Sequence, residues 1–178
     1  MKNSVKKEIE QLIEKYKLNC STEEFKDKVD WKYISSDQKL SEEFIREFKD
    51  VVNWNNISIN QKLSENFIKE FQDCVSWYFI FREQKLSEDF IREFKDEINW
   101  DQISFHQKLS EKFIREFQDK VNWYHISAYQ KLSEEFIEEF KDKINNIKVS
   151  VDTETSNNII PEIEDKYKVK NRFQLMDF

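Results

Sequence analysis

The five tryptophans of this chain recur at a constant interval of 23 residues, at positions 31, 54, 77, 100 and 123. Two series of phenylalanines keep the same interval; they are Phe44, Phe67, Phe90, Phe113 and Phe136, and Phe48, Phe71, Phe94, Phe117 and Phe140. The first full copy reads WKYISSDQKLSEEFIREFKDVVN, and a degenerate copy, EEFKDKVDW, precedes and overlaps it. A tandem repeat of this period indicates one small supersecondary unit copied along the chain.

Each copy contains an amphipathic segment, which we call the Phe helix. Its apolar residues lie within about 100° of one another on a helical wheel, and the alternation typical of a strand is absent. In the first copy these residues are Phe44, Ile45, Phe48 and Val52. Ser41 stands where an N-cap residue is expected. The pattern therefore predicts a helix that begins after Ser41, ends near Val52 and is the longer of the two helices in the unit.

A second and shorter segment, the Trp helix, is predicted to begin at each tryptophan. The residue before it is a good N-cap in each case; these residues are Asp30, Asn53, Ser76, Asn99, Asn122 and, after the last copy, Asn145. One side of this helix carries Trp31, Ile34, Ser35 and Gln38 in the first copy. A glutamine recurs on this inner side, at Gln38, Gln61, Gln84, Gln107 and Gln130. We expect these amides to form hydrogen bonds between repeats rather than to recognise a ligand.

One such hairpin buries too little apolar surface to offset the entropy of ordering it, so neighbouring units must stack. We therefore predict an all-α fold, a short α-solenoid of 23-residue helix-turn-helix repeats. Residues 1–20 are expected to form an N-terminal capping helix, and residues 21–146 the five full repeats with flanking partial ones. Residues 147–178 leave the period. They are expected to form a C-terminal cap or docking tail, which packs either on its own solenoid or on another subunit.

Composition narrows the classes of function. The chain has no glycine, which the phosphate-binding P-loop, the dinucleotide-binding turn and the nucleophile elbow all require, so we expect no enzyme. A net charge of -7 disfavours nucleic acid as a binding partner.

No secretory signal or membrane-spanning run is present, which predicts a soluble, intracellular protein that is not secreted. Cys20 and Cys74 are expected to be free thiols. His106 and His125 lack a third ligand at useful spacing, so we expect no metal and no cofactor.

The outward side of the Phe helices carries two acidic rows. They are Glu47, Glu70, Glu93, Glu116 and Glu139, and Asp50, Asp73, Asp96, Asp119 and Asp142. These rows suit a binding strip for a basic partner or a divalent ion. They also suit a solvated face held by i,i+4 ion pairs, such as Glu42 with Arg46 and Glu65 with Lys69.

The outward side of the Trp helices varies from copy to copy and carries both histidines and most aromatic residues outside the repeated core. Exposed aromatic side chains on a repeat scaffold suit protein contacts. Half-burial between neighbouring Trp helices is the competing interpretation. The candidate partner-binding residues are Tyr33, Tyr78, Phe79, Phe105, His106, Tyr124, His125 and Tyr129.

The motif WxxISxxQKLSExFIxEFxD, which covers residues 24–146, resembles tandem repeats in proteins of giant DNA viruses that infect amoebae, the mimivirus and marseillevirus groups. The resemblance implies a viral, virion-associated protein found in the host cytoplasm or the virion. The first hypothesis is a non-enzymatic repeat scaffold that binds another protein, viral or host, through the variable side of the Trp helices. The alternative is a structural, self-assembling protein, such as a homodimer, that docks through its solenoid end or its C-terminal tail.

Overall fold

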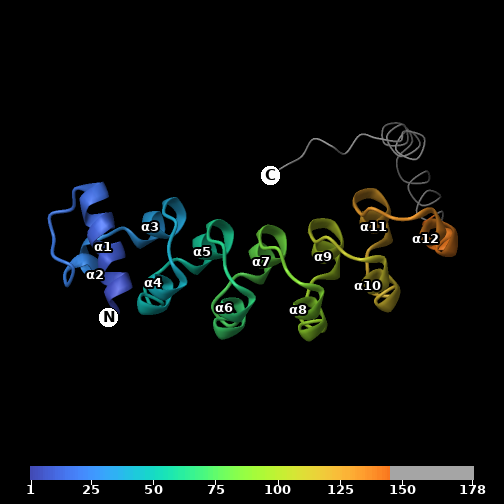
Figure 1. The fold of residues 1–178 in the computed structure, drawn as a ribbon, viewed down its shortest axis with the longest axis horizontal. Helices are drawn as coiled ribbons and strands as arrows, with labels where there is room; N and C mark the ends of the chain where they lie inside the picture. Colours follow the sequence, from blue (N-terminus) through green and yellow to red (C-terminus); the bar gives the residue numbers. More distant parts are fainter. Residues whose placement is uncertain (145–178) are drawn as a thin grey trace. The chain divides into compact units, whose positions relative to one another are not determined.

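The computed structural model describes residues 1–144, and the segment 147–178, for which the sequence predicts a cap or docking tail, lies outside the described residues. Within residues 1–144 the regular structure is helical, with no strand. The expected fold class, a short all-α solenoid of 23-residue repeats, is confirmed (Figure 1). The chain separates into two compact units, Met1–Gln107 and one that begins at Lys108, and each is described by itself.

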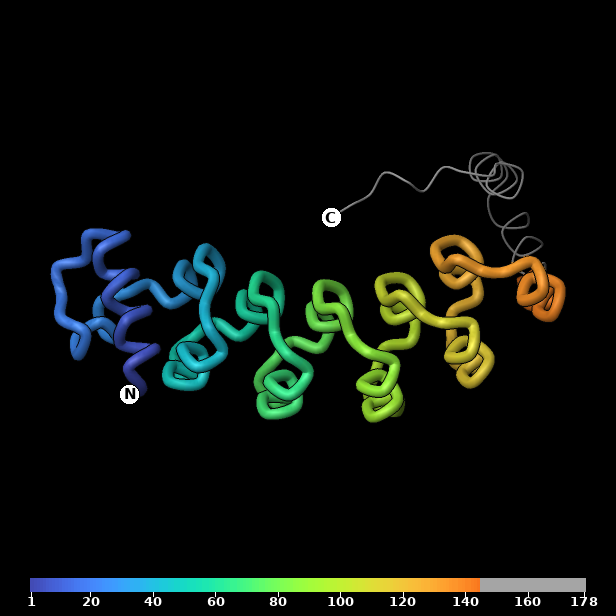
Figure 2. The backbone as a smooth tube through the Cα atoms, in the orientation of Figure 1, coloured from blue at the N-terminus to red at the C-terminus, as the bar shows by residue number. Residues whose placement is uncertain are grey.

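The first unit begins with α1 (Asn3–Tyr16) and the short α2 (Phe25–Lys28). Trp helices and Phe helices then alternate along the chain (Figure 2). The Trp helices are α3 (Trp31–Asp37), α5 (Trp54–Asn60), α7 (Trp77–Glu83) and α9 (Trp100–His106). The Phe helices are α4 (Glu42–Glu47), α6 (Glu65–Glu70) and α8 (Glu88–Glu93). Successive Trp helices pack directly on one another, α3 on α5, α5 on α7 and α7 on α9.

The second unit repeats this arrangement. Its Phe helices are α10 (Glu111–Glu116) and α12 (Glu134–Glu139), and its Trp helix is α11 (Trp123–Tyr129). The Trp123 ring lies 4.9 Å from the Phe140 ring, and Phe136 is fully buried. The same aromatic set therefore forms the core of both units.

Trp31, Trp54 and Trp77 each pack on the two phenylalanines of their own repeat. The Trp54 ring lies 5.0 Å from Phe71 and 6.3 Å from Phe67, and the two phenylalanine rings are 4.7 Å apart. Phe67 is fully buried, as is its counterpart Phe44. Burying a phenylalanine contributes about 1.5–3 kcal/mol, so a repeated triplet of this kind is the main apolar stabilisation of each hairpin.

The Phe helices are shorter than the sequence predicts. The expected end near Val52 is wrong, because α4 stops at Glu47 and a separate turn follows, in which the Val52 N–H bonds to the Phe48 carbonyl. In a continuing helix the Lys49 carbonyl would accept the Asn53 N–H. Here the Trp54 indole N–H donates to the Lys49 carbonyl at 3.0 Å, and the Asn53 N–H donates to Ser35 Oγ at 2.9 Å. At six residues, α4 is also shorter than the seven-residue α5.

The predicted N-caps are confirmed in most repeats. Ser41 Oγ accepts the Phe44 N–H, and Asn53 Oδ1 accepts the Asn56 N–H. Each such bond satisfies one of the amide donors that the first turn of a helix leaves without a partner. Ser76 is the exception in the first unit, since its side chain makes no capping bond.

The predicted glutamine ladder is confirmed from Gln61 onward, whereas the side chain of Gln38 contacts Lys15 and Tyr16 of α1. Gln61 is buried, and its Nε2 donates to the carbonyls of Ser35 and Gln38, while its Oε1 accepts the Leu40 N–H. Gln84 and Gln107 make the same three bonds to the repeat before each of them, and in the second unit Gln130 Oε1 accepts the Leu109 N–H. The amide thus joins the end of one Trp helix to the next repeat.

The same glutamines explain how the repeats fold without glycine. A helix often ends in a glycine whose positive φ lets later amides reach the last carbonyls. Here the carbonyls at the end of α3 bond to Gln61, and the C-cap residue Gln38 keeps an extended backbone, with φ -107°. Within residues 1–144 the sole residue with positive φ is Lys17, at the end of α1.

Candidate functional site

The variable side of the Trp helices, which we call the ridge, carries four strongly exposed aromatic side chains. Their exposed fractions are 48% for Tyr33, 53% for Tyr78, 39% for Phe105 and 54% for Tyr129. Within residues 1–144, the large hydrophobic side chains that are exposed are these four and Met1. Tyr33, Tyr78 and Phe105 belong to the first unit, and Tyr129 to the second. Apart from Met1, the large apolar side chains that are exposed within residues 1–144 therefore lie on the ridge.

The other four candidate residues are half-buried; they are Phe79, His106, Tyr124 and His125. Each lies edge-on to an aromatic neighbour on its own helix, with ring centroids 5.2 Å apart for Tyr78 and Phe79 and 4.4 Å apart for Phe105 and His106. The tyrosine ring of Tyr129 lies 5.9 Å from His125. These four side chains contribute to packing as well as to the outward surface.

Phe79 and His125 share the third position of their Trp helices. Asn56 occupies on α5 the place that Phe79 has on α7, and its side-chain amide donates to the Lys32 carbonyl of α3 at 2.9 Å. On α5 the side chain at the third position therefore reaches the neighbouring Trp helix. Half-burial, the competing interpretation from the sequence, applies to four of the candidate residues, and the other four are exposed; the exposed ones are Tyr33, Tyr78, Phe105 and Tyr129.

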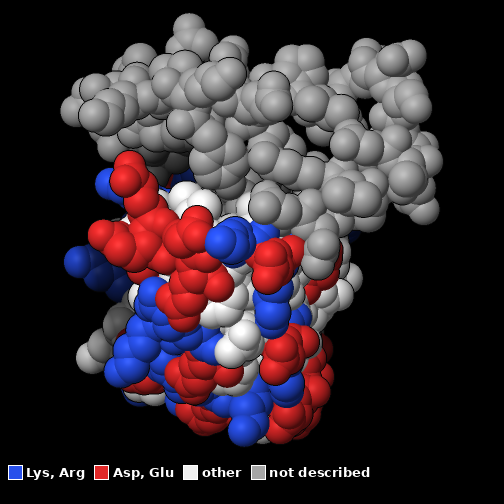
Figure 3. All heavy atoms as spheres, turned by 90° about the vertical axis from the view of Figure 1, so that its right-hand side faces the viewer, with Lys and Arg blue, Asp and Glu red and all other residues white. Residues whose placement is uncertain are grey.

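The glutamate row on the Phe helices forms ion pairs between repeats. Arg46 reaches forward to Glu70 at 2.7 Å, and its guanidinium lies 4.8 Å from the centre of the Phe67 ring. In the second unit Arg115 pairs with Glu139 at 2.8 Å. Figure 3 shows Lys and Arg side chains interspersed with Asp and Glu on the face that it presents. The ion pairs between repeats favour the solvated ionic face over a strip of free carboxylates.

The predicted i,i+4 pairs form in part. Arg46 contacts Glu42 at 3.5 Å, and Arg115 contacts Glu111 at 3.8 Å. The predicted pair between Glu65 and Lys69 is wrong, because Lys69 bonds to Glu93 of the next repeat instead. Lys69 also lies over the Phe90 ring, so pairing forward combines an ion pair with a cation–π contact.

A second carboxylate contact between repeats was not predicted. The Ser64 N–H, at the N-cap of α6, donates to Glu42 Oε1 at 2.7 Å, and Ser87 contacts Glu65 in the same way. The N-terminus of each of these Phe helices thus receives a carboxylate from the preceding repeat, where the helix dipole favours negative charge. Every copy has a serine followed by a glutamate, and this constant pair could have indicated the contact. From the sequence alone, however, the glutamate is equally well explained as an acidic residue in the first turn of its own helix.

We expect Glu111 to make the second unit acid-sensitive. Hydrogen bonds from the backbone and hydroxyl of Ser133, the former at 2.6 Å, lower the pKa of Glu111 from its ordinary 4.5. Because the folded-state pKa lies below the unfolded one, this stabilisation is complete above pH 4.5 and is lost as the pH falls through the folded-state pKa.

Glu111→Gln should therefore reduce the loss of thermal midpoint as the pH falls below the ordinary glutamate pKa of 4.5, measured by circular dichroism. Glu135→Gln, at an exposed position of α12, is the matched control and should keep the acid dependence of the unaltered protein. An unchanged pH profile in the Glu111 variant would contradict the assignment.

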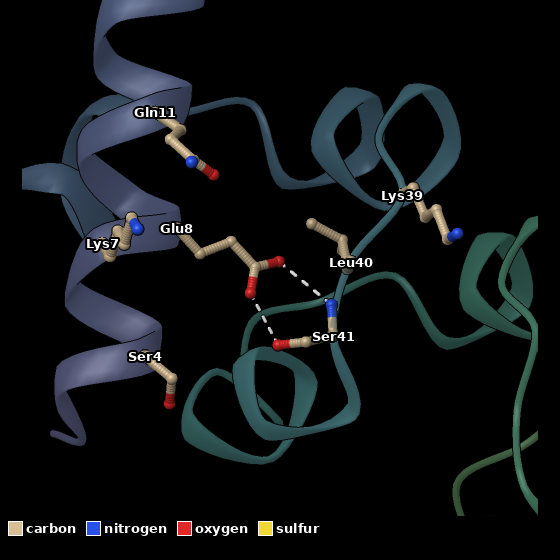
Figure 4. A pocket seen from close by; sticks show the side chains of 7 residues that line it. All are labelled: Ser4, Lys7, Glu8, Gln11, Lys39, Leu40 and Ser41. Carbon is tan, nitrogen blue, oxygen red and sulfur yellow. Dashed lines mark hydrogen bonds between the residues drawn. The ribbon is translucent and has the colours of Figure 1, made fainter.

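An open hollow of about 430 Å³ lies between α1 and the connection from α3 to α4 (Figure 4). Its lining residues are Ser4, Lys7, Glu8, Gln11, Lys39, Leu40 and Ser41. Glu8 crosses it to accept the backbone N–H of Ser41 at 3.0 Å and the Ser41 hydroxyl at 2.6 Å. Glu8 thus does for the first repeat what Glu42 does for the second, and the hollow is a junction between α1 and the repeats rather than a ligand site.

Other chemistries find little support in the described part of the chain. No group of three His, Cys, Asp or Glu side chains within residues 1–144 could hold a metal ion. Cys20 and Cys74 are free thiols. In the same residues, no helix has both the length and the apolar character needed to cross a membrane.

The fold and the ridge define a short α-solenoid repeat protein. No protein-family model, no curated protein and no solved structure matches the chain.

Proposed function

We propose that this chain is a non-enzymatic repeat scaffold that binds another protein through the ridge. One observation carries the proposal: the four exposed aromatic side chains within residues 1–144, namely Tyr33, Tyr78, Phe105 and Tyr129, all lie on the Trp helices. Aromatic side chains bury a large area at low entropic cost and are enriched at the centres of protein interfaces.

The division of labour within the repeat supports this proposal. The constant residues are occupied in holding the array together, as Gln61 and Phe67 illustrate. The ridge residues differ between copies and include few that the array needs, so they can vary without loss of the fold. A constant frame with a variable outward face is the arrangement by which repeat proteins present a binding surface.

Replacing the four exposed ridge residues with serine should abolish partner binding while leaving stability nearly unchanged. The variant carries Tyr33→Ser, Tyr78→Ser, Phe105→Ser and Tyr129→Ser, and surface changes of this kind usually alter the free energy of unfolding by about 0.5 kcal/mol or less each. The measurement is affinity capture from the native source with mass spectrometry, beside a thermal melt. Capture of the same proteins by the variant would contradict the proposal, and a large loss of stability would show that these side chains are core.

The viral setting, in the host cytoplasm or the virion, belongs to this proposal and is supported by the repeat motif alone. Self-association remains the alternative. Ile137 is half-buried in the last repeat, whereas its counterparts Ile45, Ile68, Ile91 and Ile114 are buried. The apolar face of the last repeat is thus less completely buried than those before it, and incompletely buried apolar surface favours docking. Light scattering on the intact chain separates a homodimer from the monomer with a free ridge.

A further inference from the structure

The Trp helix α7 departs from the others in sequence. Its residues read WYFIFRE, and Phe81 stands where the other four copies have serine. Phe81 is buried, with 3% of its surface exposed. On the same helix, Tyr78 is exposed and Phe79 is half-buried. Four of the seven residues of α7 are therefore aromatic.

The serine that Phe81 replaces links neighbouring repeats. Ser35 Oγ accepts the Asn53 N–H, and Ser58 Oγ accepts the Ser76 N–H, both at 2.9 Å. A phenylalanine ring offers no such acceptor to the Asn99 N–H. In the part of the chain that the structure describes, that N–H makes no hydrogen bond. Asn99 is also exposed, whereas Asn53 and Ser76 are half-buried.

The tryptophan of α7 also lacks a hydrogen bond that its counterparts make. The indoles of Trp54 and Trp100 donate to the carbonyls of Lys49 and Lys95, and those of the first and last Trp helices do likewise. Within residues 1–144, the Trp77 indole has no such bond. Instead the ring stacks on Phe81, with centroids 5.3 Å apart and planes at 29°.

Apolar packing has therefore replaced directional bonds around α7. The Gln84 and Gln107 amides still join it to both neighbours. Within residues 1–144, the Trp77 indole N–H and the Asn99 backbone N–H do not donate the hydrogen bonds that their counterparts donate. The Ser76 side chain makes no capping bond. A hydrogen bond fixes direction, whereas burial of apolar surface is non-directional and tolerates displacement. Local departures from the rules of a fold concentrate at functional sites.

We propose that α7 is the adaptable helix of the ridge and that it takes an uncharged protein segment presenting apolar side chains. The inference rests on the proposed function and names the part of the ridge that carries it. Tyr78 supplies the exposed apolar surface. The two charges of the helix, Arg82 and Glu83, neutralise each other at 2.8 Å, so α7 offers no net charge to steer a charged partner.

Hydrogen exchange in the free protein tests the adaptability without any partner. The Trp77 indole N–H and the Asn99 amide should exchange at least about tenfold faster than those of Trp54 and Asn53, the effect of losing one bond of about 1.4 kcal/mol. Two-dimensional NMR resolves the five indole signals, and Trp77→Phe assigns the one in question. Equal protection at both pairs of sites would overturn the proposal.

Two reciprocal variants give matched controls. Phe81→Ser should slow exchange at the Asn99 amide, because it restores the acceptor, and Ser58→Phe should speed exchange at the Ser76 amide, because it removes one. The Ser58 variant alone decides the matter if the Phe81 variant fails to fold. Unchanged exchange at Ser76 in that variant would show that the serine bond does not control the junction.

Selection of random peptides displayed on phage tests the partner chemistry. Enriched peptides should be apolar with no net charge, and they should lose binding to Tyr78→Ser at least about tenfold while keeping it to the matched control Tyr33→Ser. Peptides that lose binding when Tyr33 or Tyr129 is replaced with serine, but not when Tyr78 is replaced, would overturn the role of α7 and leave the ridge proposal standing. Peptides insensitive to every ridge variant would overturn both, and strongly charged peptides would overturn the stated chemistry.

Discussion

Gln61→Ala is expected to lower the free energy of unfolding by about 3 kcal/mol or more, because one truncation leaves several buried groups without partners. The Gln61 amide bonds to the carbonyls of Ser35 and Gln38 and to the Leu40 N–H, and the last of these lies in a buried setting. Each orphaned buried group costs about 1–3 kcal/mol. Urea titration followed by tryptophan fluorescence measures the change.

The neighbouring Lys62→Ala is the control for this experiment. Lys62 is exposed, so its truncation should change the free energy of unfolding by about 0.5 kcal/mol or less. If the Gln61 and Lys62 variants were equally stable, the ladder would be a consequence of stacking rather than one of its causes.

Phe67→Ala should destabilise the first unit by about 3–5 kcal/mol, the range for truncating a buried phenylalanine. Phe67 is fully buried, lies 4.7 Å from Phe71 and carries the Arg46 guanidinium over its face. The truncation therefore removes apolar burial, aromatic packing and a cation–π contact between repeats. Thermal and urea unfolding both report the loss.

Tyr78→Ala is the matched aromatic control. Tyr78 has about half of its surface in solvent, so its loss should change stability by about 0.5 kcal/mol or less. Equal losses in the two variants would mean that ridge and core residues are not separable, and the proposal for the ridge would lose its structural basis.

Several features of the fold could be predicted from the sequence because they depend on neighbours within one repeat. Ser41 and Asn53 cap their helices through bonds that span three residues. The glutamine ladder was also predictable, because a polar residue on an apolar face at every copy needs a partner in the next copy.

The error at the end of the Phe helix has a clear cause. The apolar spacing of Phe48 and Val52 continues the helical pattern, but the Trp54 indole and the Ser35 hydroxyl take the backbone groups that the helix would use. Ser35 lies 18 residues before Asn53. A wheel projection of one segment cannot include such a partner, so it predicted a longer helix.

The candidate site was predicted with mixed success for the same reason. Outward positions on the Trp helices could be listed from their variability, but the exposure of Tyr78 against the half-burial of Phe79 depends on where the neighbouring Trp helix lies. The unusual bonding of α7 was also outside sequence reasoning. Phe81 stands where the other copies have serine, and only the structure shows that this serine bonds to the next repeat.

The sequence by itself determined the unit, its period, its helical content and its capped, glycine-free junctions, because these follow from propensities and spacings within 23 residues. Tertiary structure decided which backbone groups end each helix, which cations meet which acids, and which ridge residues reach solvent. These outcomes depend on partners 18 to 26 residues away, brought close only when one repeat stacks on the next.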